Sequence, residues 1–108
     1  MLPKEYRLRA ADFASPMRTV LKNEFFSIKL RKNTLKHNRF AVIVGTRVDR
    51  RAVTRNRLRR IFYDELSRWR AGGYDGMVIV ASAAKQATRK DLHDRMRAAR
   101  EALLLTSS

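Results

Sequence analysis

The chain has 108 residues, enough for one small domain with a modest hydrophobic core. Its 25 lysine and arginine residues outnumber its 10 acidic residues, and the resulting formal net charge of +15 costs stability through self-repulsion. Such a charge indicates a polyanionic partner, with nucleic acid as the first candidate. A membrane surface is the second, but no long apolar stretch, signal peptide or lipidation motif supports it. The chain contains no cysteine, which excludes disulfide frameworks and thiolate metal sites and makes a cytoplasmic setting the default.

The first half of the chain predicts one helix and two strands. No internal repeat or long linker interrupts the sequence, so residues 1–108 are expected to form a single domain. A short helix is expected over residues 8–21, broken by Pro16 or beginning near Ser15. Residues 25–30 are aromatic and then alternating, which indicates a strand. The polar segment 32–38, with Asn33 and Asn38 as turn formers, suits a hairpin connection to a second, buried strand at 40–44.

The second half predicts two helices separated by a strand. Between about Arg50 and Arg70 the apolar residues fall at helical spacing, so an amphipathic helix of about five or six turns is expected, capped by Asp49 and ended by Gly72 and Gly73. Its apolar stripe comprises Leu58, Ile61, Phe62, Leu66 and Trp69.

A third strand is expected at 76–81. A closing helix then begins with Thr88 as its N-cap and runs to about residue 104, with Leu92, Met96, Ala99 and Leu103 facing inward. The order is therefore α-β-β-α-β-α, typical of an α/β sandwich with helices against a small sheet. The strands at 40–44 and 76–81 and the helix between them form a β-α-β unit.

The stretch AVTRNRLRRIF, residues 52–62, combines an apolar face with an arginine face. Val53 is expected to join Leu58, Ile61 and Phe62 in holding the helix to the sheet. Three ion pairs are available nearby, from Asp64 to Arg60 and Arg68 and from Glu65 to Arg68. Each is worth only about 0.2–0.5 kcal/mol and cannot neutralise the arginines. A polyanion-binding surface is therefore favoured over the alternative of a solvated charged face.

Asn56 lies between Arg55 and Arg57, where it costs helix propensity because its side chain competes for backbone hydrogen bonds. Its amide can donate to and accept from a nucleic-acid edge or a 2′-hydroxyl. The alternative is a satisfied asparagine near an irregular helix start.

Residues 52–60 resemble the "RNR" signature of the bacterial ribonuclease P protein subunit. The similarity extends over most of the chain, through Arg7-Leu8 and Asp12-Phe13, the hydrophobic strand, the turn into the signature helix, and the closing strand and helix. It implies an α/β two-layer sandwich like that of a domain of ribosomal protein S5, with room for an extra short strand. It also implies a left-handed β-α-β crossover, which periodicity alone does not predict and which the usual handedness rule contradicts.

The resemblance also implies a function. Members of the family bind the large catalytic RNA through the signature helix and the loop before it. They bind the 5′ leader of precursor tRNA in a cleft between the first helix and the sheet, and so assist endonucleolytic removal of the leader. The catalytic metal ions, Mg²⁺, are bound mainly by the RNA, so no catalytic or metal-binding residue is expected on this chain. The implied partners are ribonuclease P RNA and precursor tRNA, with no membrane and no obligate protein partner.

The family's binding residues are placed on this chain by position. Four residues match the signature and are expected to contact the catalytic RNA: Arg55, Asn56, Arg57 and Arg60. Three more are expected to support them by contacting phosphates: Arg47, Arg51 and Arg59. Four hydrophobic residues match leader-binding positions, with core packing as the alternative: Phe13, Met17, Phe26 and Ile28. Four positions depart from the family pattern, namely Gly45, Val48, Arg50 and Tyr63.

Two other classes of function remain open. A basic ribosomal or nucleoid protein would use the same charge without a role in processing. A protein-only nuclease is disfavoured, because His37 and His93 are the only histidines, lie on unrelated segments, and have no carboxylate cluster with metal-ligand spacing beside them.

Overall fold

Residues 2–9 and 16–107 are described by the computed structural model, with side chains as far as residue 103. They form four strands, two α-helices and two short 3₁₀ helices. In chain order the elements are η1 (Lys4–Tyr6), β1 (Arg18–Lys22), β2 (Phe26–Lys32), β3 (Arg39–Ile43), α1 (Ala52–Leu66), β4 (Tyr74–Val80), η3 (Ser82–Gln86) and α2 (Arg89–Ser107).

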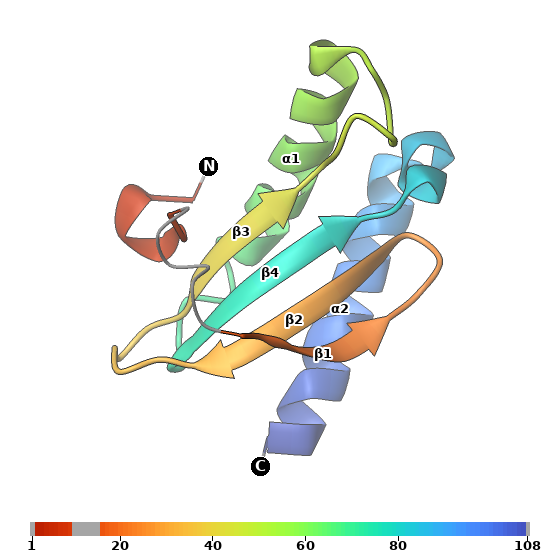
Figure 1. Ribbon diagram of the computed structural model, residues 1–108. Helices are drawn as coiled ribbons and strands as arrows, with labels where there is room; N and C mark the ends of the chain where they lie inside the picture. The colour runs from red at the N-terminus through yellow and green to blue at the C-terminus, as the bar shows by residue number, and fades with distance from the viewer. Residues whose placement is uncertain (1, 10–15, 108) are drawn as a thin grey trace.

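The four strands form one mixed sheet in the order β1-β2-β4-β3. The central strands β2 and β4 are antiparallel, whereas β3 and β4 are parallel. In Figure 1 both helices lie behind this sheet, while β3 and β4 both point to the upper right with β4 to the lower right of β3. The path from β3 through α1 to β4 is therefore a left-handed crossover, opposite to that of nearly all such units. The two-layer sandwich and the unusual crossover are confirmed.

The helix expected over residues 8–21 is wrong where the structure describes it. Arg18–Lys22 forms strand β1, which pairs antiparallel with β2 and supplies the extra short strand. The pairing shifts register between Thr19 and Leu21, so β1 is bulged. Strand pairing is a long-range contact that overrides weak local patterning in so short a segment. The rest of the expected helix includes Phe13 and Ser15, at positions 10–15, which lie outside the described residues.

The hairpin predicted between the second and third elements is also wrong, because β4 lies between β2 and β3. The asparagines instead tie the connecting segment to its neighbours. Asn33 Nδ2 donates to Asp75 Oδ1 at 3.0 Å, and Asn38 Oδ1 accepts a hydrogen bond from the Tyr74 N–H at 3.0 Å. Asn38 Nδ2 also donates to the carbonyls of Trp69 and Ala71. Asn33 and Asn38 shape the connecting segment, as expected of turn formers. The segment joins two strands that are separated by β4, so it does not form a hairpin.

The central helix is shorter than expected at both ends. Residues 52–66 form α1, and the chain leaves the helix at Ser67, well before Gly72. Arg51 occupies the N-cap position without a side-chain cap, so the prediction that Asp49 caps the helix is wrong. Asp49 Oδ1 accepts a hydrogen bond from the Arg51 N–H at 2.7 Å and so shapes the turn before the helix.

The closing helix follows its prediction. Thr88 Oγ1 accepts a hydrogen bond from the Asp91 N–H, and Asp91 Oδ2 accepts one from the Thr88 N–H, a reciprocal cap at the start of α2. Leu92, Met96 and Ala99 are buried, while Leu103 packs against the core from a partly buried position.

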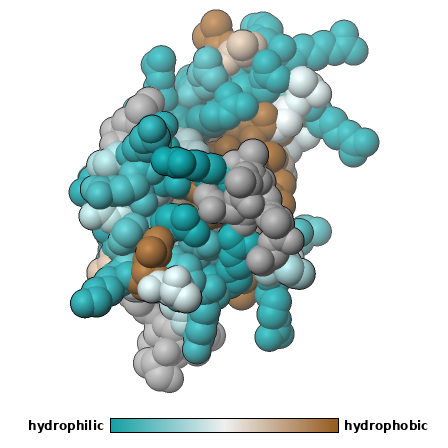
Figure 2. Space-filling model, turned by 60° about the vertical axis from the view of Figure 1, so that its left-hand side comes forward, coloured by the Kyte–Doolittle hydropathy of each residue, from teal (hydrophilic) through white to brown (hydrophobic). Residues whose placement is uncertain are grey.

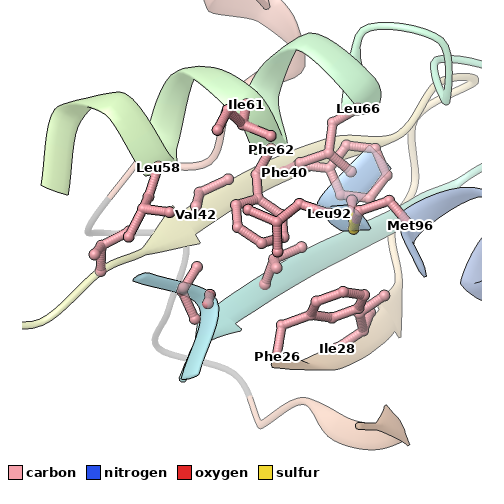
Figure 3. Close-up of a cluster of buried hydrophobic side chains, with 14 of the residues drawn as sticks. Phe26, Ile28, Phe40, Val42, Leu58, Ile61, Phe62, Leu66, Leu92 and Met96 are labelled. Carbon is pink, nitrogen blue, oxygen red and sulfur yellow. The ribbon is translucent and has the colours of Figure 1, made fainter. Parts of the chain in front are cut away.

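Apolar and charged side chains separate into an interior and an exterior. Hydrophilic residues cover most of the face shown in Figure 2, and hydrophobic residues there form separate patches. Figure 3 shows the interior, where side chains from α1, α2 and the sheet meet. The predicted stripe of α1 lies in this core, and Phe62 contacts Phe26 edge to face with ring centroids 5.5 Å apart. The helices are thus fixed against one face of the sheet, and Arg57 and Arg60 of α1 are left exposed while Arg55 and Arg59 are partly buried.

Candidate nucleic-acid interface

The exposed side of α1 and the loop before it present a group of basic and polar residues, which we call the arginine surface: Arg47, Arg50, Arg51, Arg55, Asn56, Arg57, Arg59 and Arg60. Arg47, Arg57 and Arg60 are exposed, and no carboxylate of the described residues forms an ion pair with them. The first turn of α1 contains no acidic residue, so the positive end of the helix dipole adds to the arginine charges. The arrangement is suited to binding a chain of phosphates.

Asn56 joins two of these residues into a fixed unit. Its side-chain Oδ1 accepts a hydrogen bond from Arg59 Nη1 at 2.8 Å, and Arg59 Nη2 donates to the carbonyl of Val44 at 3.4 Å. The Arg59 guanidinium is therefore oriented by its own helix and by the residue that follows β3. The structure assigns no hydrogen bond to the Asn56 Nδ2 group, which is therefore able to donate to RNA.

Arg51 differs from the other arginines of the arginine surface because it has an acidic partner. Hydrogen bonds from the Arg51 guanidinium and the Arg51 backbone N–H, aided by Lys85, hold the pKa of Asp49 well below its usual range. Arg51 Nη2 lies 3.2 Å and Lys85 Nζ 3.1 Å from Asp49 Oδ2. The three side chains together retain one net positive charge. The loop is thus organised by an ion cluster that also connects it to η3.

The four departures from the family pattern have separate structural roles. Val48 is buried in the core, and the hydroxyl of Tyr63 accepts a hydrogen bond from the Val42 N–H at 3.1 Å, so both residues stabilise the fold. Arg50 is exposed and adds a charge to the arginine surface. Gly45 is also exposed, with no atom within 4 Å of the place where a Cβ would stand.

Val53 does not hold α1 to the sheet, contrary to the prediction. Its side chain is 81% exposed, whereas Leu58 and Phe62 are fully buried. Val53 belongs to the first turn of α1, which extends past the end of β3 in Figure 1. It therefore presents an apolar contact beside the arginines.

Two of the predicted leader-binding residues are core residues. Phe26 is 1% and Ile28 0% exposed, and Figure 3 shows both in the cluster that contains Leu92 and Met96. They face the helices, so the structure corrects their assignment to a cleft. Of the other two, Met17 is half-buried just before β1, and Phe13 lies outside the described residues.

The opposite face of the sheet holds polar and apolar residues that the sequence analysis missed. Ser27 and Lys29 alternate with Phe26 and Ile28 along β2, and they pair in register with Ile79 and Met77 of β4. These four side chains are partly exposed. The alternation along β2 was the available signal, since it assigns Lys29 and Ser27 to the face opposite the core.

Comparison with known proteins decides the family. Residues 2–103 match the family model described as Ribonuclease P. The chain belongs to the ribonuclease P protein family. A curated relative, the ribonuclease P protein component of Chromobacterium violaceum, is 35% identical over 85 residues, covering 77% of this chain and 69% of the relative. The chain is thus a protein component of ribonuclease P, the ribonucleoprotein endoribonuclease of tRNA processing.

Solved ribonuclease P proteins share the fold. The Staphylococcus aureus RNase P protein has a TM-score of 0.81 and 21% identity, covering 91% of this chain and 94% of its own. The Thermotoga maritima RNase P protein has a TM-score of 0.72 and 22% identity, covering 83% of this chain and 90% of its own. Among the described helices, none is both long and apolar enough to cross a membrane.

Proposed function

We propose that the arginine surface docks this ribonuclease P protein onto the catalytic RNA of the holoenzyme. The observation that supports this role is a group of exposed arginines at the start of α1 with no acidic residue in the first turn. Arginine binds phosphates bidentately and stacks on bases, so the surface suits a folded RNA with exposed backbone. Arg57 and Arg60 contact RNA directly in this proposal, while Arg59 is oriented by Asn56.

The open face of the sheet is the proposed site for the 5′ leader of precursor tRNA. Lys29 supplies a cation, and Met77 and Ile79 supply apolar surface for unpaired bases. Met17, which lies just before β1, adds a further apolar contact, and Phe13 is included in the proposed site because it matches the family pattern. The chain's part in the reaction is to bind and position RNA, and the proposed site of action is the cytoplasm.

We propose that the Mg²⁺ ions of the holoenzyme are bound mainly by the RNA. Residues 2–9 and 16–107 contain no group of three histidine, aspartate or glutamate side chains that fits a metal ion. The proposed role of this chain, to bind and position RNA, requires no metal ion bound to the chain itself.

Reconstitution tests the proposed function. The protein is mixed with a bacterial ribonuclease P RNA and a precursor tRNA at low Mg²⁺, and cleavage at the mature 5′ end is measured. Stimulation over RNA alone is expected. The absence of stimulation would leave a basic RNA-binding protein without a processing role, and cleavage by the protein alone would revive a protein-only nuclease.

The arginine surface is tested by Arg57→Ala against the matched control Lys36→Ala. Both side chains are exposed, but Lys36 lies in the segment between β2 and β3, far from the start of α1 in Figure 1. Arg57→Ala is expected to weaken holoenzyme assembly and to lower the slope of log affinity against log salt by about one. Lys36→Ala is expected to leave both unchanged. Equal effects of the two substitutions would show that RNA binding depends on the net charge of the protein and not on the arginine surface.

The leader site is tested by Phe13→Ala and Lys29→Ala. Each is expected to weaken binding of precursor tRNA with a long leader and to leave assembly with the catalytic RNA nearly intact. A matched precursor with a leader of one nucleotide is the control, since it cannot reach the open face. Equal losses with both precursors would contradict this division of the surface.

A further inference from the structure

A pocket of about 510 Å³ lies on the helix side of the sheet, away from both proposed sites. Its lining includes residues of β1, β2, β4 and the C-terminal part of α2, together with the segment that leads from α1 to β4. Figure 1 places this end of α2 at the bottom of the molecule and the start of α1 at the top. The pocket shares no residue with the arginine surface or with the open face.

The lining combines apolar surface with unneutralised positive charge. Leu30 contributes apolar surface, and so do the small exposed parts of Phe40 and Trp69, which are 3% and 6% exposed. Arg18, Lys32 and Arg100 contribute cations, and no acidic residue lines the pocket.

These three cations are available to a ligand. Arg18, Lys32 and Arg100 are exposed, and none forms an ion pair with a carboxylate of the described residues. Arg31, which also lines the pocket, is already held by Asp75 with Nη2 3.0 Å from Oδ2. The pocket therefore lacks counter-charge for three cations, which selects against a neutral or cationic ligand.

We propose that this pocket holds one unpaired nucleotide of an RNA strand. A volume of about 510 Å³ lies within the usual range for sites that take a small molecule. The base would lie against Leu30, Phe40 and Trp69, and the phosphates on either side of it would pair with Arg18 and Arg100. A planar apolar body with flanking anions is the chemistry that this lining complements. The site gives the protein a contact with RNA at the end of the molecule opposite the start of α1.

Trp69 supplies a local signal for the test, because it is the only tryptophan of the chain and lines the pocket. Its fluorescence in the full-length protein is followed while a short single-stranded RNA is added, and binding is measured in parallel by the anisotropy of a labelled RNA. A saturable change in Trp69 fluorescence is expected. For an abasic strand of the same length and charge, the affinity obtained from Trp69 fluorescence is expected to be at least about fivefold lower.

Two substitutions with a matched control test the phosphate contacts. Arg18→Ala and Arg100→Ala are each expected to weaken the Trp69 signal several-fold and to lower its salt slope by about one. Lys22→Ala removes one exposed charge from the same strand as Arg18 but from outside the pocket, and is expected to have no effect. All three side chains are exposed, so the variants are expected to fold, which circular dichroism verifies.

Four results would overturn the proposal. These are RNA binding without any change in Trp69 fluorescence, an equal response to the abasic strand, an equal loss in Lys22→Ala, and a free nucleoside monophosphate that binds as tightly as the strand. Arg57→Ala separates this site from the arginine surface, since it is expected to weaken holoenzyme assembly while leaving the Trp69 response to short RNA in place. Loss of both in Arg57→Ala would also contradict a separate pocket.

Discussion

Asn56 has a structural partner as well as a place in the signature. Its Oδ1 accepts a hydrogen bond from Arg59 Nη1, and Arg59 reaches on to the Val44 carbonyl. Asparagine within a helix costs roughly 0.6 kcal/mol relative to alanine, so stability alone does not favour it. Its contribution is the orientation of Arg59 and the amide group left to face a partner.

Asn56→Ala is expected to separate stability from binding. The free energy of unfolding should stay the same or rise by roughly 0.5 kcal/mol, because alanine is the better helix former and the lost hydrogen bond is exposed. Affinity for the catalytic RNA should fall about tenfold. Urea unfolding and RNA titration measure the two effects. The double variant Asn56→Ala/Arg59→Ala should lose less affinity than the two single losses combined, and simple additivity would refute the coupling.

Gly72 has a positive φ of 147°, and a Cβ there would collide with the side chain of Asn38. Asn38 cannot move away without losing its hydrogen bonds to Trp69, Ala71 and Tyr74. Gly72→Ala is therefore expected to lower the free energy of unfolding by about 1–3 kcal/mol. Gly45→Ala is the control, because its Cβ would meet nothing within 4 Å. Thermal unfolding of both variants checks the difference, and equal stabilities would contradict the steric account.

At the scale of elements, Asp75 ties three strands together at one end of the sheet. It is 1% exposed and accepts hydrogen bonds from Arg31 of β2, Arg39 of β3 and the Asn33 side chain. Burial alone raises the pKa of Asp75, but the hydrogen bonds from Arg39, Asn33 and Arg31 outweigh it, so the pKa lies below its usual value. A buried carboxylate with these partners stabilises the pairing of β4 with both neighbours.

The lowered pKa of Asp75 sets the direction of a pH effect. The folded state binds the proton of Asp75 less readily than the unfolded state, whose aspartate pKa is about 3.9. The contribution of Asp75 to stability is therefore fully present above that value and is lost as the pH falls toward the folded pKa. Asp75→Asn is expected to lower the free energy of unfolding by about 2–4 kcal/mol at neutral pH. It should also flatten the loss of stability below about pH 4.

Urea unfolding of Asp75→Asn at a series of pH values measures both effects. Glu101→Gln serves as the control, since Glu101 is exposed near the C-terminal end of α2. An acid dependence identical to that of the unmodified protein would show that Asp75 does not contribute to it.

The whole molecule has a net charge of +15, and among the described residues only the carboxylates of Asp49, Glu65 and Asp75 are buried partners for its cations. Raising the salt concentration from about 10 mM to about 150 mM shortens the screening length from roughly 30 Å to roughly 8 Å. The free energy of unfolding of the free protein is expected to rise over this range because self-repulsion weakens. Affinity for RNA is expected to fall over the same range because the release of counterions into more concentrated salt is less favourable.

Urea unfolding and RNA titration at matched salt concentrations measure these opposite trends. Arg57→Ala/Arg60→Ala, with two fewer charges on one exposed surface, should show a smaller rise in stability. A free energy of unfolding that falls with salt would mean that ion pairs, and not repulsion, dominate the electrostatics of the fold.

The candidate site could be predicted in part. An arginine-rich helix face was predicted because charge of one sign opposite an apolar stripe is a local pattern. The choice of Arg55, Asn56, Arg57 and Arg60 as contacts to the catalytic RNA came from the resemblance to the RNR signature and stays a prediction. Lys29 and the pocket around Trp69 were missed. Their neighbours come from strands and helices far apart in the sequence, and only pairing and packing bring them together.

The sequence by itself determined the charge, the amphipathic character of α1, the strands β2, β3 and β4, and the capped start of α2, because each depends on residues close together in the chain. The tertiary structure decided that residues 18–22 form a strand, that β4 lies between β2 and β3, that Phe26 and Ile28 face the helices, and that Val53 faces outward. The physical reason is that strand pairing and the choice of the covered face are set by long-range contacts. A segment's own pattern shows that it has two faces, but not which one another element will bury.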